Sequence, residues 1–279
     1  NGSKSIELPF MPYGDNVISS TEGLELQELP KRLVVIGAGY IGLELGIAYR
    51  KLGSEVTFIE ALDTILPIYD TEMTRPISMW LRKHKVTINL GAKARGVSTR
   101  GKVTTVEYTD SKGQDHKIKA DKVLVTVGRR PNTQGWGLEK MAVDMDGPFV
   151  KVDDQCRTSM KNVWAIGDIV GEPMLAHKAS AQGEMVAEII AGHRRAFDPV
   201  SIAAVCFTDP EIVGVGLTPD EAKEQGIETV VGKFPFAASG RALAMDAGSD
   251  GGFVRITARA SDHVILGIHA VGSHVSELS

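Results

Sequence analysis

Three glycines and one acidic residue form the part of the chain best suited to bind a ligand. Gly37, Gly39 and Gly42 stand in G-x-G-x-x-G spacing, and Glu60 follows eighteen residues after the last of them. In a dinucleotide-binding turn the first glycine makes the tight bend, the second lets a pyrophosphate approach the backbone, and the third lets a helix pack on a strand. The acid accepts hydrogen bonds from a ribose. This spacing therefore predicts a dinucleotide site.

The elements around these residues have the order that such a site needs. An apolar run over 33–36 predicts a buried strand, a helical pattern covers 40–52 and ends at Gly53, and a second strand covers 56–59. The first N–H groups of the helix and its positive dipole end favour phosphate. An ordinary glycine-rich turn is the alternative, but a strand–turn–helix–strand unit with an acid at its end favours dinucleotide binding.

The residues after Glu60 indicate which dinucleotide is bound. A 2′-phosphate next to a carboxylate would be repelled, and NADP sites usually supply an arginine nearby. Ala61, Leu62 and Asp63 include no cation. NAD is therefore favoured over NADP.

The composition limits the class of protein. A chain of 279 residues, 43% hydrophobic and 24% charged, is long enough for two globular domains. A net charge of −4 gives no reason to expect a nucleic-acid partner, and no apolar run approaches the roughly 20 residues of a membrane span. Cys156 and Cys206 have neither CxxC nor CxxxxC spacing, so we expect two free thiols in a reducing compartment and no metal site. The first ten residues lack an initiator Met and a signal-peptide core, so we expect a fragment or a processed chain.

Patterns along the chain predict the remaining elements. Besides a turn or short helix at 19–23, the expected helices cover 71–85, 174–191 and 219–225. The expected strands cover 86–90, a β-hairpin of 103–108 and 116–119, 123–127, 163–166, 213–215, 229–235, 252–257 and 264–271. The change from alternating strands and helices to successive strands after residue 205 predicts a separate α+β unit.

Two further candidates for ligand binding stand at the ends of expected strands. Gly128 follows the strand 123–127, where a ligand can approach the backbone, although a turn with two solvated arginines explains the same residues. Asp168 follows the apolar run 163–166 and could accept a hydrogen bond from a sugar or polyol hydroxyl. An acid in that position is more often an N-cap or turn residue. Both alternatives stay open from the residues alone.

Seven stretches of the sequence, taken in chain order, are shared with one protein family. They are GAGYIGLELG, the acid Glu60, VTVGRRPN, AIGDI, MLAHKA, AVCFTDPEIVGVGLT and FPFAASGRALA. Together they resemble the FAD-dependent pyridine nucleotide–disulfide oxidoreductases, and within that family the branch that oxidises dihydrolipoyl groups. The resemblance runs along nearly the whole chain. It implies an α/β protein with four segments: the end of an FAD-domain segment (1–30), a Rossmann-like NAD-binding domain with a parallel sheet and a β-hairpin insertion (31–148), a second FAD-domain or central segment (149–203), and a partial α+β dimerisation domain (204–279).

The resemblance also implies which residues hold NAD. The family's pyrophosphate loop and the start of the following helix correspond to Gly37, Ala38, Gly39, Tyr40, Ile41, Gly42, Leu43 and Glu44. The acid that binds the adenosine ribose corresponds to Glu60, and a residue lining the adenine side corresponds to Ala94. A backbone contact to NAD corresponds to Gly128. Tyr40 matches an aromatic residue that covers the nicotinamide pocket. Glu44 matches an acid that lies near the flavin and pairs with a lysine beside the redox disulfide. A solvated helical glutamate is the alternative for Glu44.

On the FAD side, the resemblance assigns Asp168 to the ribityl–phosphate region of the cofactor. Met174, Leu175, Ala176 and His177 correspond to a strip along the flavin ring that binds mostly through its backbone. Gly2 and Ser3 correspond to a Thr-Gly-Ser turn that passes the FAD, with Asn1 in the place of the threonine. The family's CxxxxC disulfide, its own FAD glycine motif and its His-Pro catalytic base are absent from the sequence, and His177, His269 and His274 lack the context of that base.

The implied activity is the oxidation of a dihydrolipoyl dithiol by NAD⁺ through FAD and a redox disulfide. We expect the whole protein to be a homodimer that serves lipoyl-bearing components of 2-oxo acid dehydrogenase or glycine cleavage complexes, in the bacterial cytoplasm rather than the mitochondrial matrix. The alternatives are another flavin disulfide reductase on the same scaffold and, for the chain by itself, a non-catalytic NAD-binding module.

Overall fold

The computed structural model describes residues 1–101 and 103–279, which divide into two compact units. The larger unit contains Glu7–Val127 and Ala203–Ser279, and the smaller unit contains Asn1–Ile6 and Gly128–Ile202. The chain therefore passes between the units near residues 6, 127 and 202. The four segments expected from the sequence stay a prediction, and the two units are described separately below.

The first half of the larger unit is a parallel five-stranded sheet in the order β2-β9-β3-β4-β5. Its strands are β2 (Val17–Ile18), β3 (Arg32–Ile36), β4 (Glu55–Ile59), β5 (Thr87–Asn89) and β9 (Lys122–Val125). The helices are α1 (Ser20–Glu25), α2 (Tyr40–Leu52) and α3 (Thr71–Lys83). The expected helix over 40–52 has the predicted bounds, because Gly53 adopts the left-handed conformation (φ +114°) that ends it.

A three-stranded antiparallel sheet is inserted between β5 and β9. The predicted hairpin is present as β7 (Val103–Thr109) and β8 (Asp115–Ala120), but a third strand, β6 (Lys93–Arg100), pairs with β7. The sequence did not reveal β6 because it is mostly polar and a bulge between Ala94 and Gly96 breaks its alternation. The insertion is thus a small sheet rather than a hairpin alone.

The second half of the larger unit is an antiparallel sheet in the order β13-β14-β17-β16-β15. Its strands are β13 (Ala204–Cys206), β14 (Glu211–Gly216), β15 (Thr229–Pro235), β16 (Phe253–Arg259) and β17 (Ile265–Gly272). Short helices α5 (Pro219–Glu224) and α6 (Gly240–Ala244), together with 3₁₀ turns at Phe236–Ala238 and Val275–Leu278, connect or follow them. The predicted capping box of α5 is confirmed, with Thr218 and Glu221 as its two members.

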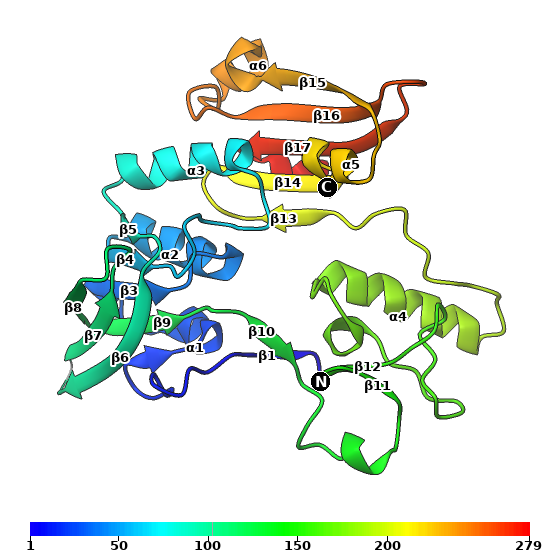
Figure 1. Ribbon diagram of the computed structural model, residues 1–279, viewed down its shortest axis with the longest axis horizontal. Coiled ribbons are helices and arrows are strands. Elements are labelled where there is room, and N and C mark those ends of the chain that lie inside the picture. The colour runs from blue at the N-terminus through cyan, green and yellow to red at the C-terminus, as the bar shows by residue number, and fades with distance from the viewer. Residues whose placement is uncertain (102) are drawn as a thin grey trace. The chain divides into compact units, whose positions relative to one another are not determined.

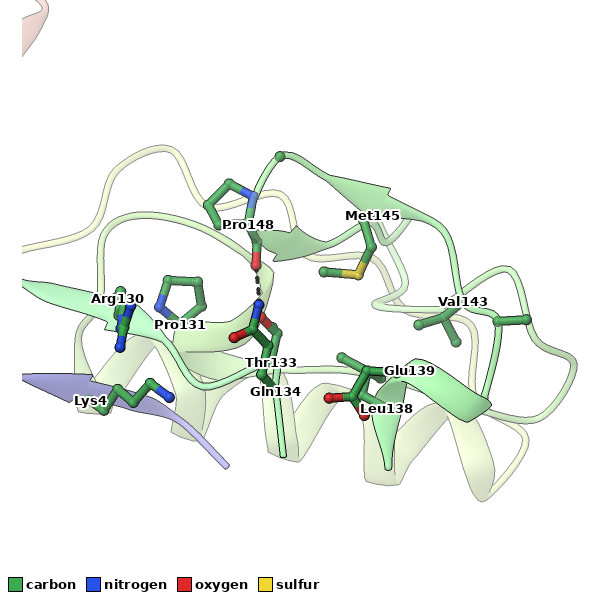
Figure 2. A pocket seen from close by; sticks show the side chains of 12 residues that line it. Lys4, Arg130, Pro131, Thr133, Gln134, Leu138, Glu139, Val143, Met145 and Pro148 are labelled. Atoms are coloured by element: carbon green, nitrogen blue, oxygen red, sulfur yellow. Dashed lines mark hydrogen bonds between the residues drawn. The ribbon is translucent and has the colours of Figure 1, made fainter. Parts of the chain in front are cut away.

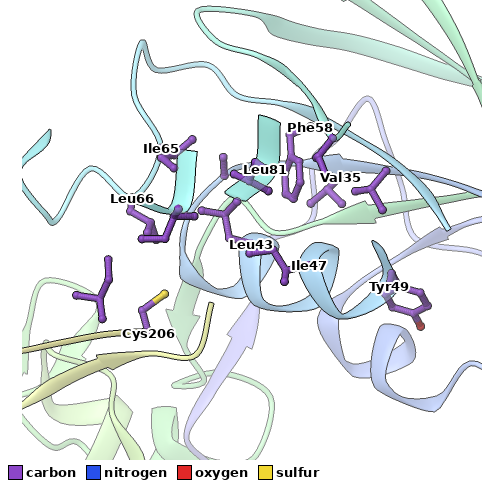
Figure 3. Packing of buried hydrophobic residues seen from close by; sticks show 14 of the residues in the cluster. Val35, Leu43, Ile47, Tyr49, Phe58, Ile65, Leu66, Leu81 and Cys206 are labelled. Carbon is purple, nitrogen blue, oxygen red and sulfur yellow. The ribbon is translucent and has the colours of Figure 1, made fainter. Parts of the chain in front are cut away.

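The two halves of the larger unit share one hydrophobic core. Leu43 and Ile47 from α2, and Phe58 from β4, belong to the same buried cluster as Cys206 from β13 (Figure 3). Ile212, Phe253 and Val271 of the antiparallel sheet also belong to it. Because the cluster is continuous, the two sheets of this unit are held together by apolar burial.

The smaller unit has little regular structure apart from one helix, α4 (Ala176–Ile190). Two short ribbons, β1 (Ser3–Ser5) with β10 (Arg129–Pro131) and β11 (Met145–Asp146) with β12 (Phe149–Val150), and 3₁₀ turns at Leu138–Lys140 and Gly167–Val170 accompany it (Figure 1). The expected strand at 163–166 is wrong, since these residues form only an isolated bridge from Trp164 to Arg157. Residues 129–131, for which a turn with two solvated arginines was one of two open alternatives, form a strand that pairs with β1.

No helix in the described part of the chain is long and apolar enough to cross a membrane.

Candidate functional site

The glycine loop of the larger unit has the geometry that its spacing predicts. Gly37 adopts φ +101°, and a Cβ atom added to it would lie 2.7 Å from the carbonyl oxygen of Thr126. A Cβ added to Gly42 would lie 2.3 Å from the carbonyl oxygen of Gly37, so only glycine lets α2 approach the loop this closely. In contrast, a Cβ on Gly39 would meet nothing within 4 Å. The loop is closely packed at its first and third glycines and open at the second.

The open glycine stands at the start of a thirteen-residue helix. Gly39 is the N-cap of α2 and offers no side chain to its first N–H groups. These groups and the helix dipole favour an anion at this end. A pyrophosphate can therefore approach the backbone at Gly39, which is what the sequence predicts.

Glu60 lies against this loop. Its side chain is 8% exposed, and its Oε2 atom accepts a hydrogen bond from the backbone N–H of Ala38 at 2.5 Å. Its Oε1 atom accepts one from the N–H of Leu62 at 2.8 Å. A carboxylate has about four lone-pair positions, so two backbone donors leave capacity for ribose hydroxyls. The predicted acid and the predicted phosphate loop are thus in direct contact.

Ala94 lies on β6 at the bulge and packs in the same hydrophobic cluster as Ile59, the residue before Glu60. The chain that leads to it passes beside the acid, since Ala92 N–H donates to the Glu60 carbonyl at 2.8 Å. The assignment of Ala94 to the adenine side of the site is compatible with this position.

Glu44, in the second turn of α2, is joined to the antiparallel sheet. Its Oε1 atom accepts the backbone N–H of Phe207 at 2.9 Å, next to Cys206 at the end of β13. Burial raises the pKa of the Glu44 carboxyl, and the Phe207 N–H opposes that rise. The alternative of a solvated helical glutamate does not describe this half-buried, hydrogen-bonded side chain. Tyr40, Ile41 and Leu43 precede it in the first turn of the same helix.

Both cysteines are free and buried, as the sequence predicts. Burial, with a smaller contribution from Glu44, raises the pKa of Cys206 to about 12. Burial, with a smaller contribution from Asp153, raises the pKa of Cys156 to about 11. The thiolate is the reactive form, so neither residue has the character of a redox nucleophile.

The smaller unit gathers three of the residues predicted for the FAD side. Ser3 Oγ donates to Asp168 Oδ2 at 2.5 Å, and a Cβ added to Gly2 would lie 4.0 Å from the same oxygen. Gly2 adopts φ +56° and Gly167 adopts φ +77°, so two left-handed glycines flank the pair. Asp168 lies in a 3₁₀ turn, which agrees with the turn alternative, and its side chain bonds to Ser3 instead of capping a helix.

Three polar residues of this cluster were missed by sequence reasoning. Arg129 donates from Nε to Ser3 Oγ at 2.7 Å and from Nη2 to the Ser3 carbonyl at 2.8 Å. On α4, Lys178 donates to the Gly171 carbonyl at 2.6 Å, and Gln182 accepts the Gly167 N–H at 2.8 Å. Both α4 side chains are buried, and the sequence gives no signal of this, because polar residues at i and i+4 usually mark the exposed face of a helix.

The segment 174–177, which is predicted to lie along the flavin ring, leads into helix α4 and forms its first residues. Met174 and Leu175 are non-helical and Leu175 is the N-cap, while Ala176 and His177 form the first turn. No side chain caps this helix N-terminus. Gly128, at φ +128°, opens the second segment of the smaller unit, and its carbonyl accepts the Ile6 N–H at 3.1 Å.

A hollow of about 480 Å³ also lies in the smaller unit, beside the ribbon of β1 and β10 (Figure 2). Lys4 and Arg130 line one end, Glu139 lies across from them, and Met145 and Pro148 supply apolar wall. None of the residues predicted for FAD is among its described lining residues. No group of three or more potential metal ligands occurs in the part of the chain that the structure describes.

Comparison with known proteins gives matches along the whole chain. A family model described as "Pyridine nucleotide-disulphide oxidoreductase" matches residues 2–183, and one described as its dimerisation domain matches residues 202–279. The chain is 58% identical to a dihydrolipoyl dehydrogenase of Pseudomonas aeruginosa over 278 residues, which is 100% of this chain and 59% of that protein. It is 46% identical to one from Geobacillus stearothermophilus, covering 99% of this chain and 58% of the relative.

Solved structures give the same likeness. LpdA from Mycobacterium tuberculosis matches with a TM-score of 0.89 at 28% identity, over 99% of this chain and 60% of that one. The flavoprotein disulfide reductase RclA from Escherichia coli matches with a TM-score of 0.90 at 26% identity, over 99% of this chain and 64% of that one. The chain thus spans about 59% of the length of the curated relatives that it matches.

Proposed function

This chain belongs to the pyridine nucleotide-disulphide oxidoreductase family, and from that we propose that it carries the NAD site and part of the FAD site of a dihydrolipoyl dehydrogenase. The reaction oxidises a dihydrolipoyl dithiol to the cyclic disulfide and reduces NAD⁺ to NADH with release of a proton. When bound, FAD supplies the two-electron relay between the dithiol and the nicotinamide. The residues of this chain bind and orient the two nucleotides.

The observation that carries the proposal is the contact between Glu60 and the glycine loop. The ribose-binding acid and the phosphate-binding backbone must touch neighbouring parts of one ligand, and Glu60 Oε2 lies 2.5 Å from the Ala38 nitrogen. In the described part of the chain, Glu60 has no ion-pair partner within 4.0 Å. An uncompensated carboxylate repels a 2′-phosphate, which supports NAD over NADP.

In this proposal, Gly37 to Glu44 hold the pyrophosphate and nicotinamide ends of NAD, with Tyr40 over the nicotinamide. Ala94 lines the adenine side, and Gly128 contributes backbone. Glu44 is the acid proposed to support the flavin side of the hydride transfer, as the resemblance to the family implies. Its link to Phe207 supports this role because it fixes the carboxyl position from a second element.

The FAD side uses the Ser3–Asp168 pair for the ribityl–phosphate region and the segment from Met174 to His177 along the flavin ring. The 2.5 Å contact between Ser3 and Asp168 supports this assignment, since it joins two residues that are 165 positions apart in the sequence. The Arg129 guanidinium donates to the same Ser3 hydroxyl oxygen that donates to Asp168. The uncapped N-terminus of α4 adds dipole and N–H groups.

We also propose that the antiparallel sheet forms a homodimer, as the match to the dimerisation domain suggests. Lipoyl-bearing components of 2-oxo acid dehydrogenase or glycine cleavage complexes are the proposed partners, in the bacterial cytoplasm. The bacterial relatives named dihydrolipoyl dehydrogenase support this choice. A different flavin disulfide reductase is the second candidate, favoured by the likeness to RclA.

Titration of the purified 279-residue chain with NADH and NADPH tests the NAD site. We expect NADH to bind at least tenfold more tightly than NADPH, which corresponds to about 1.4 kcal/mol.

We expect no lipoamide-dependent formation of NADH from this chain by itself, because its two cysteines are fifty residues apart and do not form a CxxxxC pair. Equal affinity for NADH and NADPH would contradict the predicted NAD site, and measurable lipoamide turnover would contradict the predicted inactivity of this chain by itself. Full activity of the complete protein with lipoamide, and none with other disulfides, would separate the first candidate from the second.

A further inference from the structure

Arg255 joins the antiparallel sheet to the start of helix α3. It lies on β16 with a side chain that is 5% exposed. Its Nη2 atom donates to Asp70 Oδ2 at 2.5 Å and its Nη1 atom to Glu72 Oε2 at 3.0 Å. Lys233 of β15 donates to the other Glu72 oxygen at 2.5 Å. One buried guanidinium thus holds two carboxylates of the nucleotide-binding half of the unit.

Asp70 also ends the loop that begins after Glu60. Its Oδ1 atom caps α3 by accepting the N–H groups of Glu72 and Met73 at 3.0 and 3.1 Å. Burial by itself would raise the pKa of Asp70, but the Arg255 guanidinium and the two N–H groups outweigh it and hold the pKa below its usual value. The side chain therefore fixes one end of the 61–70 loop with both of its oxygens.

The other end of this loop is tied to the dinucleotide site. Leu62 donates to the Glu60 carboxylate at 2.8 Å, and Leu66 N–H donates to the Ala38 carbonyl at 3.0 Å. Leu66 is fully buried in the cluster of Figure 3 and adopts φ +47°, a left-handed conformation that leucine rarely takes. Such strain persists only where the surroundings hold the backbone. The loop is therefore held in place by its two attachments.

A hollow borders part of the loop, although Ile65 and Leu66 are buried in the hydrophobic core. Asp63, Thr64 and Ile65 line a hollow of about 720 Å³ beside α3 and β5. The loop is thus held by its bonded ends together with the burial of Ile65 and Leu66.

We propose that Arg255 is a positioning residue for the adenosine half of the dinucleotide, an inference that rests on the proposed NAD site. By holding Asp70 it keeps the 61–70 loop on the glycine loop, and so keeps the Glu60 carboxylate and the Ala38 backbone in their binding geometry. The same residue stands on the sheet proposed to form the dimer, so it links that sheet to NAD affinity.

The test measures the affinity of the purified chain for ADP-ribose, the part of NAD that contacts Glu60. Arg255→Met is expected to weaken binding about tenfold, and Arg255→Lys to restore part of it, since lysine keeps the charge without the two-pronged geometry. Arg259→Met is the matched control, because Arg259 lies four residues further along β16 and pairs with Asp262 in the exposed turn. It should leave the affinity unchanged within twofold.

A double-mutant cycle separates positioning from a general loss of structure. If Arg255 acts through the loop and Glu60, the double variant Arg255→Met with Glu60→Gln binds ADP-ribose no more weakly than whichever single variant has the lower affinity. Asp70→Asn, which keeps an acceptor for the cap but not the charge, should reproduce the loss if Arg255→Met folds poorly. Losses that multiply in the double variant, or full affinity in both Arg255→Met and Asp70→Asn, would overturn the inference. Absence of ADP-ribose binding in the unaltered chain would instead overturn the proposed NAD site.

Discussion

Glu60 Oε2 accepts the N–H of Ala38 at 2.5 Å, so the acid that is expected to hold the ribose also holds the glycine loop. The residue is 8% exposed, and its second oxygen accepts the N–H of Leu62. A ligand that bonds to this carboxylate meets an acceptor that is already oriented. The same carboxylate stabilises the glycine loop itself, so binding and folding are linked at one side chain.

Replacing Glu60 is therefore expected to affect stability as well as binding. Glu60→Ala leaves the buried N–H groups of Ala38 and Leu62 without an acceptor, which costs about 1–3 kcal/mol of unfolding free energy. It should weaken NADH binding by a similar amount, about 1–3 kcal/mol. Urea denaturation and NADH titration measure the two effects. Glu55→Ala, at the exposed start of the same strand, is the control and should change neither.

Substitutions at Gly42 and Gly39 should have different effects on folding and on ligand binding. Gly42→Ala places a Cβ 2.3 Å from the Gly37 carbonyl oxygen and should destabilise the fold strongly. Gly39→Ala meets no atom within 4 Å and keeps φ at −75°, so it should cost less than about 1 kcal/mol of unfolding free energy. It should nevertheless weaken NADH binding, because the new methyl group occupies the open side of the loop. Equal destabilisation by the two substitutions would contradict these roles, and thermal denaturation beside NADH titration distinguishes them.

The nucleotide-binding half was predictable because its signals are local. Strand, turn, helix and acid follow one another within thirty residues, and α2 has the bounds that its pattern predicts. Elements that depend on a distant partner were missed. A solvated turn remained an alternative for Arg129 because nothing nearby in the sequence indicates Ser3, 126 residues away, as its partner.

The same limit applies to the polar interior of the protein. Arg255 and Asp70 are 185 positions apart, and neither residue has a local pattern that indicates an ion pair. Lys178 and Gln182 are buried on α4 because they bind backbone groups of the 167–171 turn, although polar residues usually mark the exposed face of a helix. Local periodicity predicts which apolar residues are buried, and long-range hydrogen bonds decide which polar residues join them.

Acidification should weaken the larger unit through His269. This side chain is 5% exposed and lies directly opposite Arg255 in the sheet. Burial and the Arg255 charge lower the pKa of His269, against the smaller opposing effects of Asp70 and Glu221. The unfolded chain therefore binds this proton more readily than the folded one, so stability is lost as the pH falls below the usual histidine value of about 6.5.

Urea denaturation between about pH 7.5 and 5 measures this effect, above the ordinary carboxyl pKa values of about 3.9 for Asp and 4.3 for Glu. His269→Gln should have a flatter dependence on pH over that range than the unaltered chain. His193→Gln, in an exposed position, is the matched control and should keep the original slope. An unchanged slope in His269→Gln would show that another group is responsible.

The outer face of the antiparallel sheet should form the homodimer contact. Ile256 and Ile268 are directly paired on adjacent strands and are each 37% exposed, on the face opposite Arg255 and His269. Phe234, which pairs with Val254 on that same face, is 48% exposed. Apolar side chains gathered on one sheet face are typical of an association surface. A carboxylate placed there would lose its hydration in the dimer without gaining a partner.

Ile256→Asp is therefore expected to weaken dimerisation at least tenfold, or about 1.4 kcal/mol, while the monomer keeps its fold. The substitution also removes the buried part of Ile256 and places a residue disfavoured in strands in β16, so the unfolding free energy per chain should fall by about 1 kcal/mol. Sedimentation equilibrium over a range of concentrations gives the dissociation constant, and circular dichroism reports the fold. Val264→Asp places the same charge at an exposed apolar residue just before β17 and should leave the dissociation constant unchanged. A dimer that tolerates Ile256→Asp but not Val264→Asp would place the contact at the end of the sheet instead of on its face.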